Sequence, residues 1–524
     1  MDENFKYLFC KHLLLDHIPY GTAGFRCHSR HMFGVVCRAM PLIALRSIFL
    51  QKNCGVMITA SHNPVDDNGL KIIDPDGSML KIDWETYFTS LVNVESWNEY
   101  EEQWKAICIK LGISSKLGLD GARVLVGIDT RPSSLQLEEL ILDCSKIHKF
   151  SVVRCKLVTT PQLHYAVLKS NVICDADTDY YTFFSQHFNN FMQNMKLPTF
   201  SFFLDCANGV GGLQFVEFLQ YVKCCPEVTF YNNGEGILND GCGADFVKIE
   251  QAPPRGVEIK RNALYASFDG DADRIIFYCL NESGQFTLLD GDRIACLYCE
   301  ALRRLLHNSG YRDLNIAVVQ TAYANGASTR YLQNKGLNIV CTKTGVKHLH
   351  EAASKHKLAV YFEANGHGTV CFQSSFLEEL KTKVDSPEAT PEHSLLYSFL
   401  SLTNSTTGDA MTNFLQVYAA LAYLDWTYID WVKIYKDLPC IQIKVNVPDR
   451  ALIQTENAER SVVSPKGMQS KIDEIIGSGD NFRRCFVRPS GTENVVRVYA
   501  EAATHSEACD LANGVKGVVE SILS

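Results

Sequence analysis

The chain has 524 residues, of which 46% are hydrophobic and 21% are charged. This length exceeds what one hydrophobic core can hold and predicts about three or four domains, while the composition is that of a globular protein and excludes an intrinsically disordered chain. The formal net charge of -9 argues against a nucleic-acid partner and against binding to an anionic membrane. An anionic small ligand would therefore need local clusters of basic residues.

The N-terminal segment gives no sign of a secretory signal. It reads MDENFK, with acidic residues where a signal peptide needs net positive charge, so a cytosolic location is expected. The longest apolar stretch, residues 33–50, contains Arg38, Pro41 and Arg46. It predicts a buried helix, kinked or restarted at the proline, rather than a membrane span.

The 20 cysteines are scattered along the chain, which fits a reducing compartment. One pair, Cys296 and Cys299, has the spacing of a metal or redox motif. Because both sulfurs would lie on one face of an apolar helix, buried packing is the favoured interpretation.

The first polar loop, residues 20–26, reads YGTAGFR. Its two glycines let backbone N–H groups approach an anion, and Arg26 can donate two hydrogen bonds to phosphate oxygens. Such loops are common, so this pattern alone does not separate an anion site from an ordinary turn.

The stretch 55–64, GVMITASHNP, predicts a short strand that delivers Ser61 onto a loop. Residues 56–58 are continuously apolar, as in a strand covered on both faces, and Pro64 keeps the preceding residue out of helical geometry. We expect the Ser61 hydroxyl to be exposed. The alternative is an ordinary turn whose polar side chains bond their own backbone. Lys71 begins the next strand and is either a charge partner of this loop or a surface lysine.

Strand-like runs at residues 124–128 and 152–157 are each followed by a polar loop. Alternating strands and helices predict an α/β sheet with mostly parallel strands. Ligands of such sheets bind at the carboxyl ends of the strands, so we expect the site in these loops.

A second domain is expected from about residue 180, with its first strand at residues 200–204. The following stretch, DCANGVGG at residues 205–212, opens a helix. Its glycines match neither the dinucleotide fingerprint nor a Walker loop, so we do not expect NAD or ATP binding.

Residues 267–274, SFDGDADR, are the clearest metal signal and lie between predicted strands at 264–268 and 275–280. Its three carboxylates stand at alternate positions: Asp269, Asp271 and Asp273. Packed together without a cation, the three carboxylates would repel one another. A site with only a few protein ligands leaves coordination positions open, which suits a Mg2+ ion that also binds a phosphate oxygen. An EF-hand is excluded because Arg274 and Leu280 occupy its glycine and glutamate positions. An exposed acidic hairpin is the alternative.

A third α/β unit is expected from about residue 290, with strands at 316–320, 338–342 and 358–362. Polar loops follow these strands and include TGVKH at 344–348 and EANGHG at 363–368. In the latter loop Glu363, Asn365 and His367 offer an acceptor, an amide and a titratable group, which suits binding of sugar hydroxyls. His367 is alternatively a core histidine.

After residue 439 the pattern becomes antiparallel. Residues 441–447 alternate, a hairpin surrounds RPSGTE at 488–493, and a terminal helix at 505–523 completes a small α+β domain. The donors of an anion-binding nest are gathered here: Arg488, Ser490, Gly491, Thr492 and, beyond them, Arg497. This loop is the strongest phosphate candidate.

A presented serine, a magnesium-type acidic triad, a sugar-binding turn and a phosphate nest together describe phosphoryl transfer on a phosphosugar. Such transfer needs mainly positioning and charge neutralisation. Since there is no nucleotide-binding loop, the phosphate must come from the enzyme itself, which predicts a phosphoserine at Ser61 in the resting state.

With these motifs in this order, the chain resembles the α-D-phosphohexomutases over nearly its whole length. The serine loop, the DxDxDR metal loop, the sugar loop and the RPSGT phosphate loop all match. Branches that act on glucose or mannose phosphates typically carry Ser-Gly-His in the sugar loop. Asn365 makes this chain similar to the branch that acts on N-acetylglucosamine phosphates.

The resemblance implies three related mixed-sheet α/β domains and a C-terminal α+β domain around a central cleft. We place the domains at residues 1–178 with the phosphoserine loop, 179–289 with the metal loop, 290–436 with the sugar loop and 437–524 with the phosphate loop. It also implies interconversion of N-acetylglucosamine 6-phosphate and 1-phosphate for UDP-N-acetylglucosamine synthesis. Phospho-Ser61 would donate its phosphate, giving a 1,6-bisphosphate whose other phosphate returns to the serine.

The resemblance further assigns roles. Mg2+ would be held by Asp269, Asp271, Asp273 and a phosphate oxygen on Ser61. The transfer site would be lined by Arg26, His62 and Arg274, and proton transfer would fall to Lys71, if neighbouring cations lower its pKa, or to His367. The substrate would be bound by Thr344, Gly345, Lys347, Glu363, Asn365, Gly366, His367, Arg488, Ser490, Gly491, Thr492 and Arg497.

Two departures from the family pattern stand out. Residues 27–36 are shorter and more basic than expected, which bears on the geometry of Arg26, and Asn494 stands where an acidic residue is expected. Two other functions remain open: a phosphoglucomutase or phosphomannomutase, opposed by Asn365, and a non-catalytic sugar-phosphate binder, opposed by the retained serine and aspartates. The expected partner is a small phosphosugar, with no nucleic acid or membrane, for a monomer or weak homo-oligomer.

Overall fold

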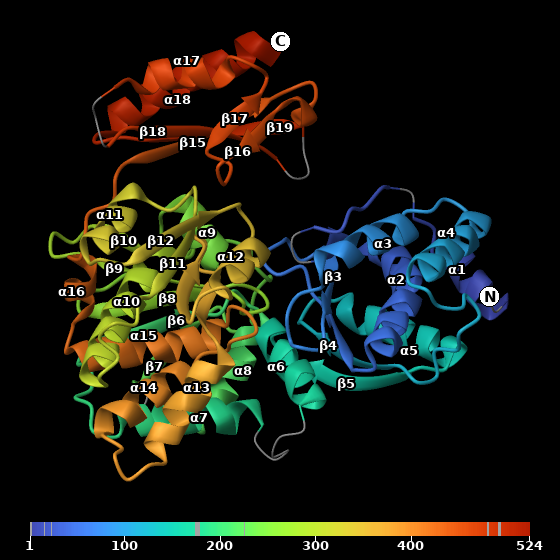
Figure 1. Cartoon of the computed structure of the whole chain (residues 1–524), viewed down its shortest axis with the longest axis horizontal. Helices are drawn as coiled ribbons and strands as arrows, with labels where there is room; N and C mark the ends of the chain where they lie inside the picture. The colour runs from blue at the N-terminus through green and yellow to red at the C-terminus, as the bar shows by residue number, and fades with distance from the viewer. Residues whose placement is uncertain are drawn as a thin grey trace. The chain divides into compact units, whose positions relative to one another are not determined.

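The computed structural model describes residues 3–14, 16–21, 24–172, 179–224, 226–478, 482–490 and 494–523. The chain separates into two compact units, drawn in Figure 1. The first is Met1–Leu288 with Ser401–Ala419, and the second is Leu289–Leu400 with Ala420–Ser524. Each of the four main sheets falls inside one of the four predicted domain ranges. The four-domain boundaries stay a prediction.

The first sheet has the strand order β1-β3-β2-β4-β5. β2, β4 and β5 are parallel, whereas β3 is antiparallel to β2 and β1 to β3. The strands are β1 (Phe25–His28), β2 (Cys54–Ile58), β3 (Asp67–Ile73), β4 (Arg123–Ile128) and β5 (Ser151–Leu157). The helices are α1 (Glu3–Lys11), α2 (Ser29–Leu50), α3 (Ile82–Val92), α4 (Trp97–Lys110), α5 (Ser134–His148) and α6 (Thr160–Asn171).

Both faces of this sheet are covered, which explains the continuously apolar sequence of β2. Val56 and Ile58 point into the core that includes α2 and α5, and Met57 points into a second core with Leu163 and Val167 of α6. Successive side chains of a strand alternate between faces, so each face needs its own apolar cover. The predicted buried strand is confirmed.

Helix α2 is one continuous helix with Pro41 inside it, so a restart at Pro41 is wrong, the alternative of a kink stays a prediction, and the predicted burial is confirmed. By length and composition α2 could cross a membrane, but 78% of its apolar window is buried inside the protein. Its two buried arginines have partners there: Arg46 Nε lies 2.5 Å from Asp74 Oδ1, and Arg38 donates to the His12 carbonyl at 2.8 Å. Their charges are therefore compatible with a core position.

The second sheet has the order β10-β9-β8-β6-β7. Its strands are β6 (Ser201–Asp205), β7 (Val228–Tyr231), β8 (Ala263–Phe268), β9 (Ile275–Leu280) and β10 (Phe286–Leu289). The helices nearby in sequence are α7 (Tyr180–Met192), α8 (Val210–Leu219) and α9 (Ala244–Glu250). The prediction that residues 205–212 lead into a helix is confirmed by α8.

Helix α15 (Ala410–Leu424) returns to this second sheet from far along the chain. The ring of Phe414 lies 5.1 Å from that of Phe215 on α8 and 5.8 Å from that of Phe202 on β6. This aromatic packing explains why residues 401–419 group with the first compact unit.

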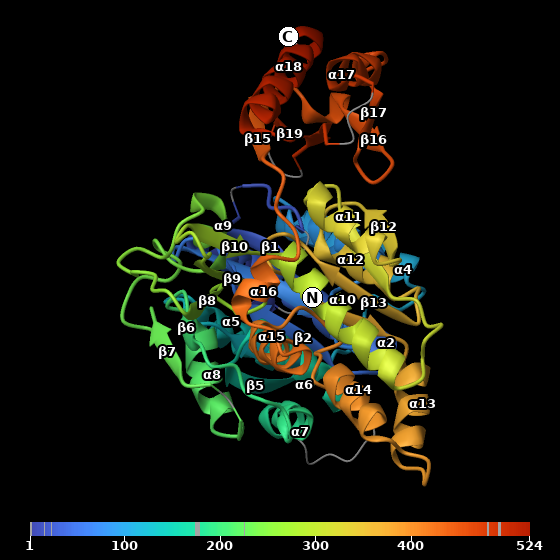
Figure 2. The same cartoon turned by 90° about the vertical axis from the view of Figure 1, so that its left-hand side faces the viewer.

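The third sheet has the order β12-β11-β13-β14, with β14 antiparallel and the other three strands parallel. The strands are β11 (Ala317–Thr321), β12 (Asn338–Thr342), β13 (Leu358–Phe362) and β14 (Gly368–Phe372). The helices are α10 (Gly291–Asn308), α11 (Gly326–Asn334), α12 (Val346–Ala353), α13 (Ser374–Val384), α14 (Pro391–Ser401) and α16 (Tyr428–Val432). α10 and α12 both pack on β13 (Figure 2). Cys296 and Cys299 are buried in α10, which confirms their packing role.

The C-terminal region is the predicted antiparallel α+β structure. β15 (Cys440–Asn446), β19 (Val495–Glu501) and β18 (Arg484–Pro489) form a sheet in this order. α18 (His505–Leu523) packs on the sheet and α17 (Met468–Ile476) packs beside α18 (Figure 1). A short 3-10 helix (Arg450–Leu452) and a hairpin of β16 (Gln454–Glu456) and β17 (Ser461–Ser464) complete the region.

The three α/β sheets share one local arrangement. In each, a strand paired in parallel to an earlier or later neighbour turns through a polar loop into an antiparallel strand: β2 into β3, β8 into β9, and β13 into β14. The serine, aspartate and sugar loops are these three connections. Since both ends of each loop are held by a sheet, the loops are well suited to position side chains.

Candidate functional site

Ser61 lies in the loop between β2 and β3 in the left-handed region, at φ +53°. Its side chain is fully buried, and Oγ donates a hydrogen bond of 2.6 Å to Asp269 Oδ2. The prediction of an exposed hydroxyl is therefore wrong. The loop between β8 and β9 approaches so closely that a Cβ at Gly270 would lie 2.5 Å from the Ser61 carbonyl oxygen. A glycine is required there, and the serine and aspartate loops form one site.

Arg131 binds the backbone of the serine loop. Its Nε donates to Asp129 Oδ2 at 3.0 Å, and its four remaining N–H groups reach backbone carbonyls of the serine loop. These carbonyls belong to Ser61 (2.9 Å), Asn63 (2.9 Å), Pro64 (2.5 Å) and Asp67 (2.8 Å). All five guanidinium donors are thus used to fix the loop that carries the reactive hydroxyl. The sequence showed this arginine only as part of a polar loop after β4.

Asn239 adds a second clamp from the second sheet region. Its side-chain amide donates to the carbonyls of Ser61 at 2.9 Å and Asn63 at 3.0 Å. The backbone of the aspartate loop is held in turn, since the N–H of Ala410, at the start of α15, donates to the Ala272 carbonyl at 3.0 Å. Sequence analysis missed both contacts, and no local motif marks either residue.

The three aspartates of the loop between β8 and β9 form a compact acidic cluster. One ligand oxygen from each of Asp269, Asp271 and Asp273 lies within 4.8 Å of the others, and all three residues are buried. Asp269 Oδ1 accepts from the backbone N–H of Asp273 at 3.1 Å and of Arg274 at 3.2 Å. Burial rules out the alternative of an exposed acidic hairpin.

Lys71 on β3 is the cation of this cluster. Its Nζ lies 2.6 Å from Asp271 Oδ2 and 2.8 Å from Asp273 Oδ2. Burial lowers the pKa of Lys71, but the two carboxylates outweigh it and the net shift is upward. The condition for proton transfer by Lys71, that burial beside cations lowers its pKa, is therefore not met, because the neighbours that it bonds are anions. The structure makes Lys71 a charge partner, not a surface lysine.

The cluster still carries more negative charge than Lys71 offsets. Burial raises the pKa of Asp269 well above its ordinary value, and the charges of Asp273 and Asp271 add to this. Burial and Asp273 also raise the pKa of Asp271, but Lys71 and Thr160 outweigh them. Asp271 Oδ1 is buried and has no hydrogen-bond partner among the residues that the structure describes. An orphaned carboxylate oxygen amid repelling acids fits a hard divalent cation, so the triad is positioned to bind a metal ion.

Further cationic groups surround the triad. Arg274 Nη1 donates to Asp245 Oδ1 at 2.8 Å, and the other oxygen of Asp245 lies 3.5 Å from His62 Nε2. Burial and then Arg274 lower the pKa of His62 to about 3, so this histidine is neutral near pH 7. Asp245, at the start of α9, escaped the sequence analysis because nothing in its local sequence distinguishes it from a surface acid.

Arg26 lies on β1, opposite Gly69 of β3. Burial and Arg274 lower its pKa, and the three aspartates raise it, which shows that its guanidinium lies in the field of the triad. β1 ends at His28 and α2 begins at Ser29, so the short segment after Arg26 is simply a strand running directly into a helix. Thr22 and Ala23 of this first loop lie outside the described residues.

In the second unit two predicted substrate-binding loops, residues 344–348 and the sugar loop at 363–368, meet at Glu363. Its Oε1 accepts from the Gly345 N–H at 3.1 Å, and its Oε2 accepts from Asn365 Nδ2 at 3.2 Å. Asn365 Oδ1 in turn accepts from the His367 N–H at 3.0 Å. Glu363 and Asn365 are half-buried, whereas His367 is buried, as in the alternative of a core histidine. Lys347 lies in the first turn of α12.

The predicted phosphate residues lie on the C-terminal sheet. Arg488 on β18 is directly opposite Arg497 on β19, and Arg497 is opposite Lys444 on β15. Directly opposite residues share a face, so three cations form one row across three strands. Glu459 pairs with Arg488 of this row at 3.0 Å, and a phosphate would place a further anion beside the three cations, which supports a phosphate site. Ser490 follows β18, while Gly491 and Thr492 lie outside the described residues. Lys444 was missed, because only strand pairing reveals its position.

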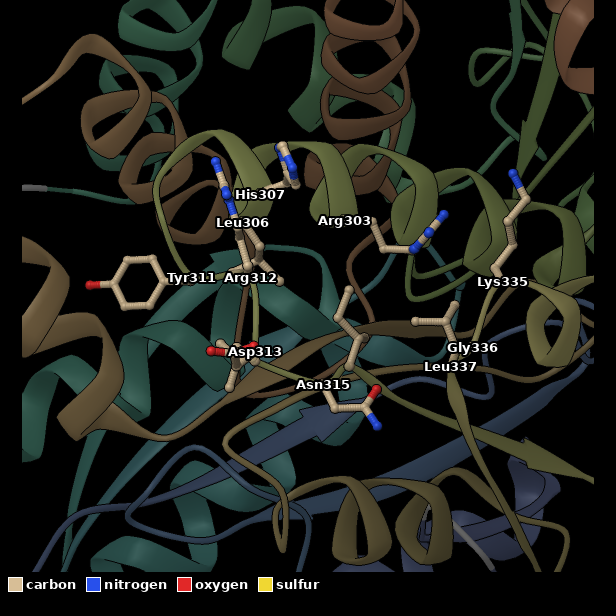
Figure 3. A pocket seen from close by; sticks show the side chains of 12 residues that line it. Arg303, Leu306, His307, Tyr311, Arg312, Asp313, Asn315, Lys335, Gly336 and Leu337 are labelled. Carbon is tan, nitrogen blue, oxygen red and sulfur yellow. The ribbon is translucent and has the colours of Figure 1, made fainter.

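A cavity of about 420 Å3 in the second unit lies elsewhere (Figure 3). It contains none of the predicted site residues, and its basic side chains include Arg303 and His307 near the end of α10, where cations stabilise the helix dipole. It also lies at the amino ends of β11 and β12, whereas ligands of α/β sheets bind at the carboxyl ends. The cavity is not the candidate site.

Comparison with known proteins agrees with this geometry. Residues 28–99 and 105–177 match the family "Phosphoglucomutase/phosphomannomutase, alpha/beta/alpha domain I", and residues 443–517 match its C-terminal domain. Residues 171–276 and 290–426 match "Phosphoacetylglucosamine mutase AMG1", domains II and III.

Whole-length relatives carry the same name. The chain is 43% identical to phosphoacetylglucosamine mutase 1 of Schizosaccharomyces pombe, over 95% of this chain and 98% of the relative. It is 42% identical to phosphoacetylglucosamine mutase of Homo sapiens, over 95% and 93%. A crystal structure of Aspergillus fumigatus N-acetylphosphoglucosamine mutase, in complex with GlcNAc-6P and magnesium, is 39% identical and superposes with a TM-score of 0.90 over 97% of this chain and 96% of that one.

A further solved structure, an N-acetylglucosamine-phosphate mutase in its substrate complex, is 39% identical with a TM-score of 0.91 and is described as a member of the alpha-D-phosphohexomutase superfamily; the match covers 99% of this chain and 100% of that one. The fold is therefore that of a phosphohexomutase, an enzyme that moves a phosphoryl group within its substrate. Within that class, the chain belongs to the phosphoacetylglucosamine mutase family.

Proposed function

We propose that the chain interconverts N-acetylglucosamine 6-phosphate and N-acetylglucosamine 1-phosphate, through a phosphoserine at Ser61 and a 1,6-bisphosphate, and so feeds UDP-N-acetylglucosamine synthesis. The observation that carries the proposal is the 2.6 Å contact between Ser61 Oγ and Asp269 within a buried acidic triad. The relative solved with GlcNAc-6P and magnesium supports both the substrate and the metal.

In the first half-reaction a hydroxyl oxygen of the sugar attacks the phosphorus of phospho-Ser61. The bond from phosphorus to Ser61 Oγ breaks, the proton of the sugar hydroxyl ends on Ser61 Oγ, and the sugar becomes the bisphosphate. In the second half-reaction Ser61 Oγ attacks the other phosphate, the bond from that phosphorus to the sugar oxygen breaks, and the serine proton returns to the sugar oxygen, so that Ser61 again carries a phosphoryl group. No net phosphate is consumed, in keeping with an isomerase.

Mg2+ held by Asp269, Asp271 and Asp273 together with a phosphate oxygen on Ser61 would neutralise charge on the phosphoryl group. Arg26 and Arg274 add fixed positive charge beside the same position. Arg131 and Asn239 keep the Ser61 backbone in place, so little reorganisation is needed when charge develops. Lys71, protonated between two carboxylates, offsets part of the charge of the triad and cannot act as a base while it keeps that proton.

For the sugar, we propose that Glu363 and Asn365 bind hydroxyl groups or the acetamido group, with Thr344, Gly345, Lys347, Gly366 and His367 around them. Arg488, Ser490 and Arg497, with Gly491 and Thr492, bind the phosphate that does not react. Relatives of this name share some 40% of the sequence across nearly its whole length, which favours an acetylated hexose over glucose or mannose.

The decisive experiment is peptide mapping by mass spectrometry before and after incubation with N-acetylglucosamine 6-phosphate and Mg2+, with product followed by phosphorus NMR. We expect phosphate on Ser61 and appearance of the 1-phosphate, both lost in Ser61→Ala. Ser114→Ala, an exposed serine of the same unit, is the control and should keep both. Full turnover by Ser61→Ala would remove the serine from the mechanism. Faster turnover of glucose 6-phosphate than of the acetylated sugar would assign the chain to a different substrate.

We also propose that the protein works in the cytosol, as a monomer or weak homo-oligomer without nucleic acid or membrane partners. The net charge of -9 supports this, as does the lack of disulfide bonds among the cysteines within the described ranges. Light scattering of the eluting protein and fractionation of cells test it; a stable large assembly or membrane association would contradict it.

A further inference from the structure

The hairpin of β16 and β17 (Figure 1) carries an unusual backbone. Three successive residues other than glycine, Asn457, Ala458 and Glu459, have φ values of 51°, 56° and 66°. Left-handed conformations are unfavourable for residues with a Cβ and occur mostly singly. A run of three persists only where the surroundings hold it, and such strain gathers at functional sites. The strained backbone of this hairpin therefore needs an explanation, and the contacts of the Glu459 side chain provide one.

Glu459 joins two loops that are far apart in the sequence. Its Oε2 accepts from the backbone N–H of Thr344, in the first sugar loop, at 2.8 Å. Its Oε1 accepts from Nε of Arg488, beside the phosphate loop, at 3.0 Å. Both oxygens of one carboxylate are thus committed, one to each loop. Burial raises the pKa of Glu459, but Thr344 and Arg488 outweigh it and lower the pKa, so the group is a carboxylate near neutral pH.

The contact with Glu459 uses only one side of the Arg488 guanidinium, which also interacts with Tyr323. Glu459 binds Nε, so the edge formed by the two terminal nitrogens is not the one it engages. That edge is the one that can donate two parallel hydrogen bonds to a phosphate. Arg497, directly opposite on β19, supplies a second cation on the same face. Held at Nε, Arg488 is limited in the directions its fork can point.

We infer that Glu459 is a positioning residue that couples hexose binding to phosphate binding. It orients Arg488 toward the non-reacting phosphate and holds the Thr344 loop against the sugar. The distance between the phosphate-binding and sugar-binding residues is thereby fixed. This inference rests on the proposed function. The strained turn is the backbone that aims this one carboxylate.

Removing the charge of Glu459 could either strengthen or weaken phosphate binding, so the direction of the change in KM tests the inference. A carboxylate near a phosphate site repels the ligand, so removing its charge would tighten binding if Glu459 did no more than that. If it positions Arg488 and Thr344, removing its charge weakens binding instead. Because the phosphate concerned keeps its bonds while the other one is transferred, the loss should appear in KM and not in kcat.

The test compares Glu459→Gln with Glu456→Gln, an exposed acid on β16 of the same hairpin. We expect KM for N-acetylglucosamine 6-phosphate to rise roughly tenfold in Glu459→Gln, with kcat within about twofold, and no change in Glu456→Gln. Glu459→Asp should share the rise, since the shorter side chain cannot reach both partners. An unchanged or lower KM in Glu459→Gln overturns the inference, whereas an inactive parent protein would refute the proposed function.

A double-mutant cycle guards against a folding defect. If Glu459 acts through Arg488, Glu459→Gln should raise KM much less in an Arg488→Lys background than in the parent. Equal factors in both backgrounds would show that the two residues act independently and would also overturn the inference.

Discussion

The two clusters of site residues differ in how they are built. In the first unit, Ser61 and the aspartates are buried, and protein groups bond the serine hydroxyl and its backbone on several sides. In the second unit, the site residues Thr344, Glu363, Asn365 and Arg488 are only half-buried. The first three lie on loops and Arg488 lies on β18, and a few carboxylate contacts connect them. The cluster assigned to chemistry is packed like a core, and the cluster assigned to binding is not.

Charge separates them as well. The first cluster has an excess of carboxylates with Lys71 as the bonded cation, while the second presents a row of cations across β15, β19 and β18. Each excess matches its proposed ligand, a divalent metal ion in one case and a phosphate in the other. A buried charge cluster gains most from an exact counter-ion, because the low dielectric strengthens both repulsion and attraction. Changes in the first cluster should therefore have the larger effects.

The largest effect is expected for Asp269→Asn. Loss of one carboxylate from the triad should lower kcat about a hundredfold to a thousandfold. Since repulsion within the triad is relieved, the metal-free variant should unfold at the same or a higher temperature than the parent, while added Mg2+ should stabilise the parent more. Steady-state assays and thermal unfolding with EDTA or Mg2+ measure this.

The control is Asp240→Asn, an exposed acid on the same unit. More than a tenth of parental activity in Asp269→Asn would contradict the assignment of the triad. So would an equal Mg2+-induced rise in the unfolding temperature of Asp269→Asn and of the parent.

Next comes Arg131→Lys, which keeps the charge but loses the fork that binds four carbonyls of the serine loop. We expect the free energy of unfolding to fall by about 3 kcal/mol and kcat to fall markedly, because a buried pair is disrupted and the loop is released. Urea unfolding and steady-state kinetics check both. Arg154→Lys, whose arginine side chain is 50% exposed, should leave the free energy of unfolding nearly unchanged. Equal costs in the two variants would show that the clamp on Ser61 is unimportant.

In the second unit, Asn365→Ser should change selectivity more than rate. The shorter side chain cannot keep the contact of Asn365 Nδ2 with Glu363, so the discrimination between acetylated and plain hexose 6-phosphates should fall by roughly tenfold in kcat/KM. Competition between the two sugars in one assay gives the ratio directly. Asn334→Ser, exposed at the end of α11, is the control. A ratio that does not move would exclude Asn365 as a specificity residue.

The smallest effect is expected for Ala458→Gly. Glycine accepts the φ of 56° without strain, so the free energy of unfolding should rise by about 0.5 to 1 kcal/mol with KM unchanged. Ala352→Gly within α12 should instead cost about 1 kcal/mol. Denaturant titration of both variants gives the comparison; a loss of stability in Ala458→Gly would mean that the turn is not strained.

The sequence by itself was sufficient where the signal is local. β12, β13 and α18 have the predicted bounds, because apolar runs of strand or helix period are delimited by glycine, proline or polar residues. The residues to which we assign the chemistry were also singled out from the sequence, since three alternating aspartates or a serine before His-Asn-Pro are recognisable within a few positions. The helix does not restart at Pro41, because packing on all sides keeps α2 helical despite one lost hydrogen bond.

Only the tertiary structure decided how these residues are held. The Ser61 carbonyl is bonded by Arg131 and Asn239, which are 70 and 178 positions away. Lys71 meets Asp271 across 200 positions, and Glu459 meets Thr344 across 115. No window of sequence contains such pairs. They arise because sheets bring distant loops to one edge, and that proximity also buried Ser61 and raised the pKa of Lys71 against local expectation.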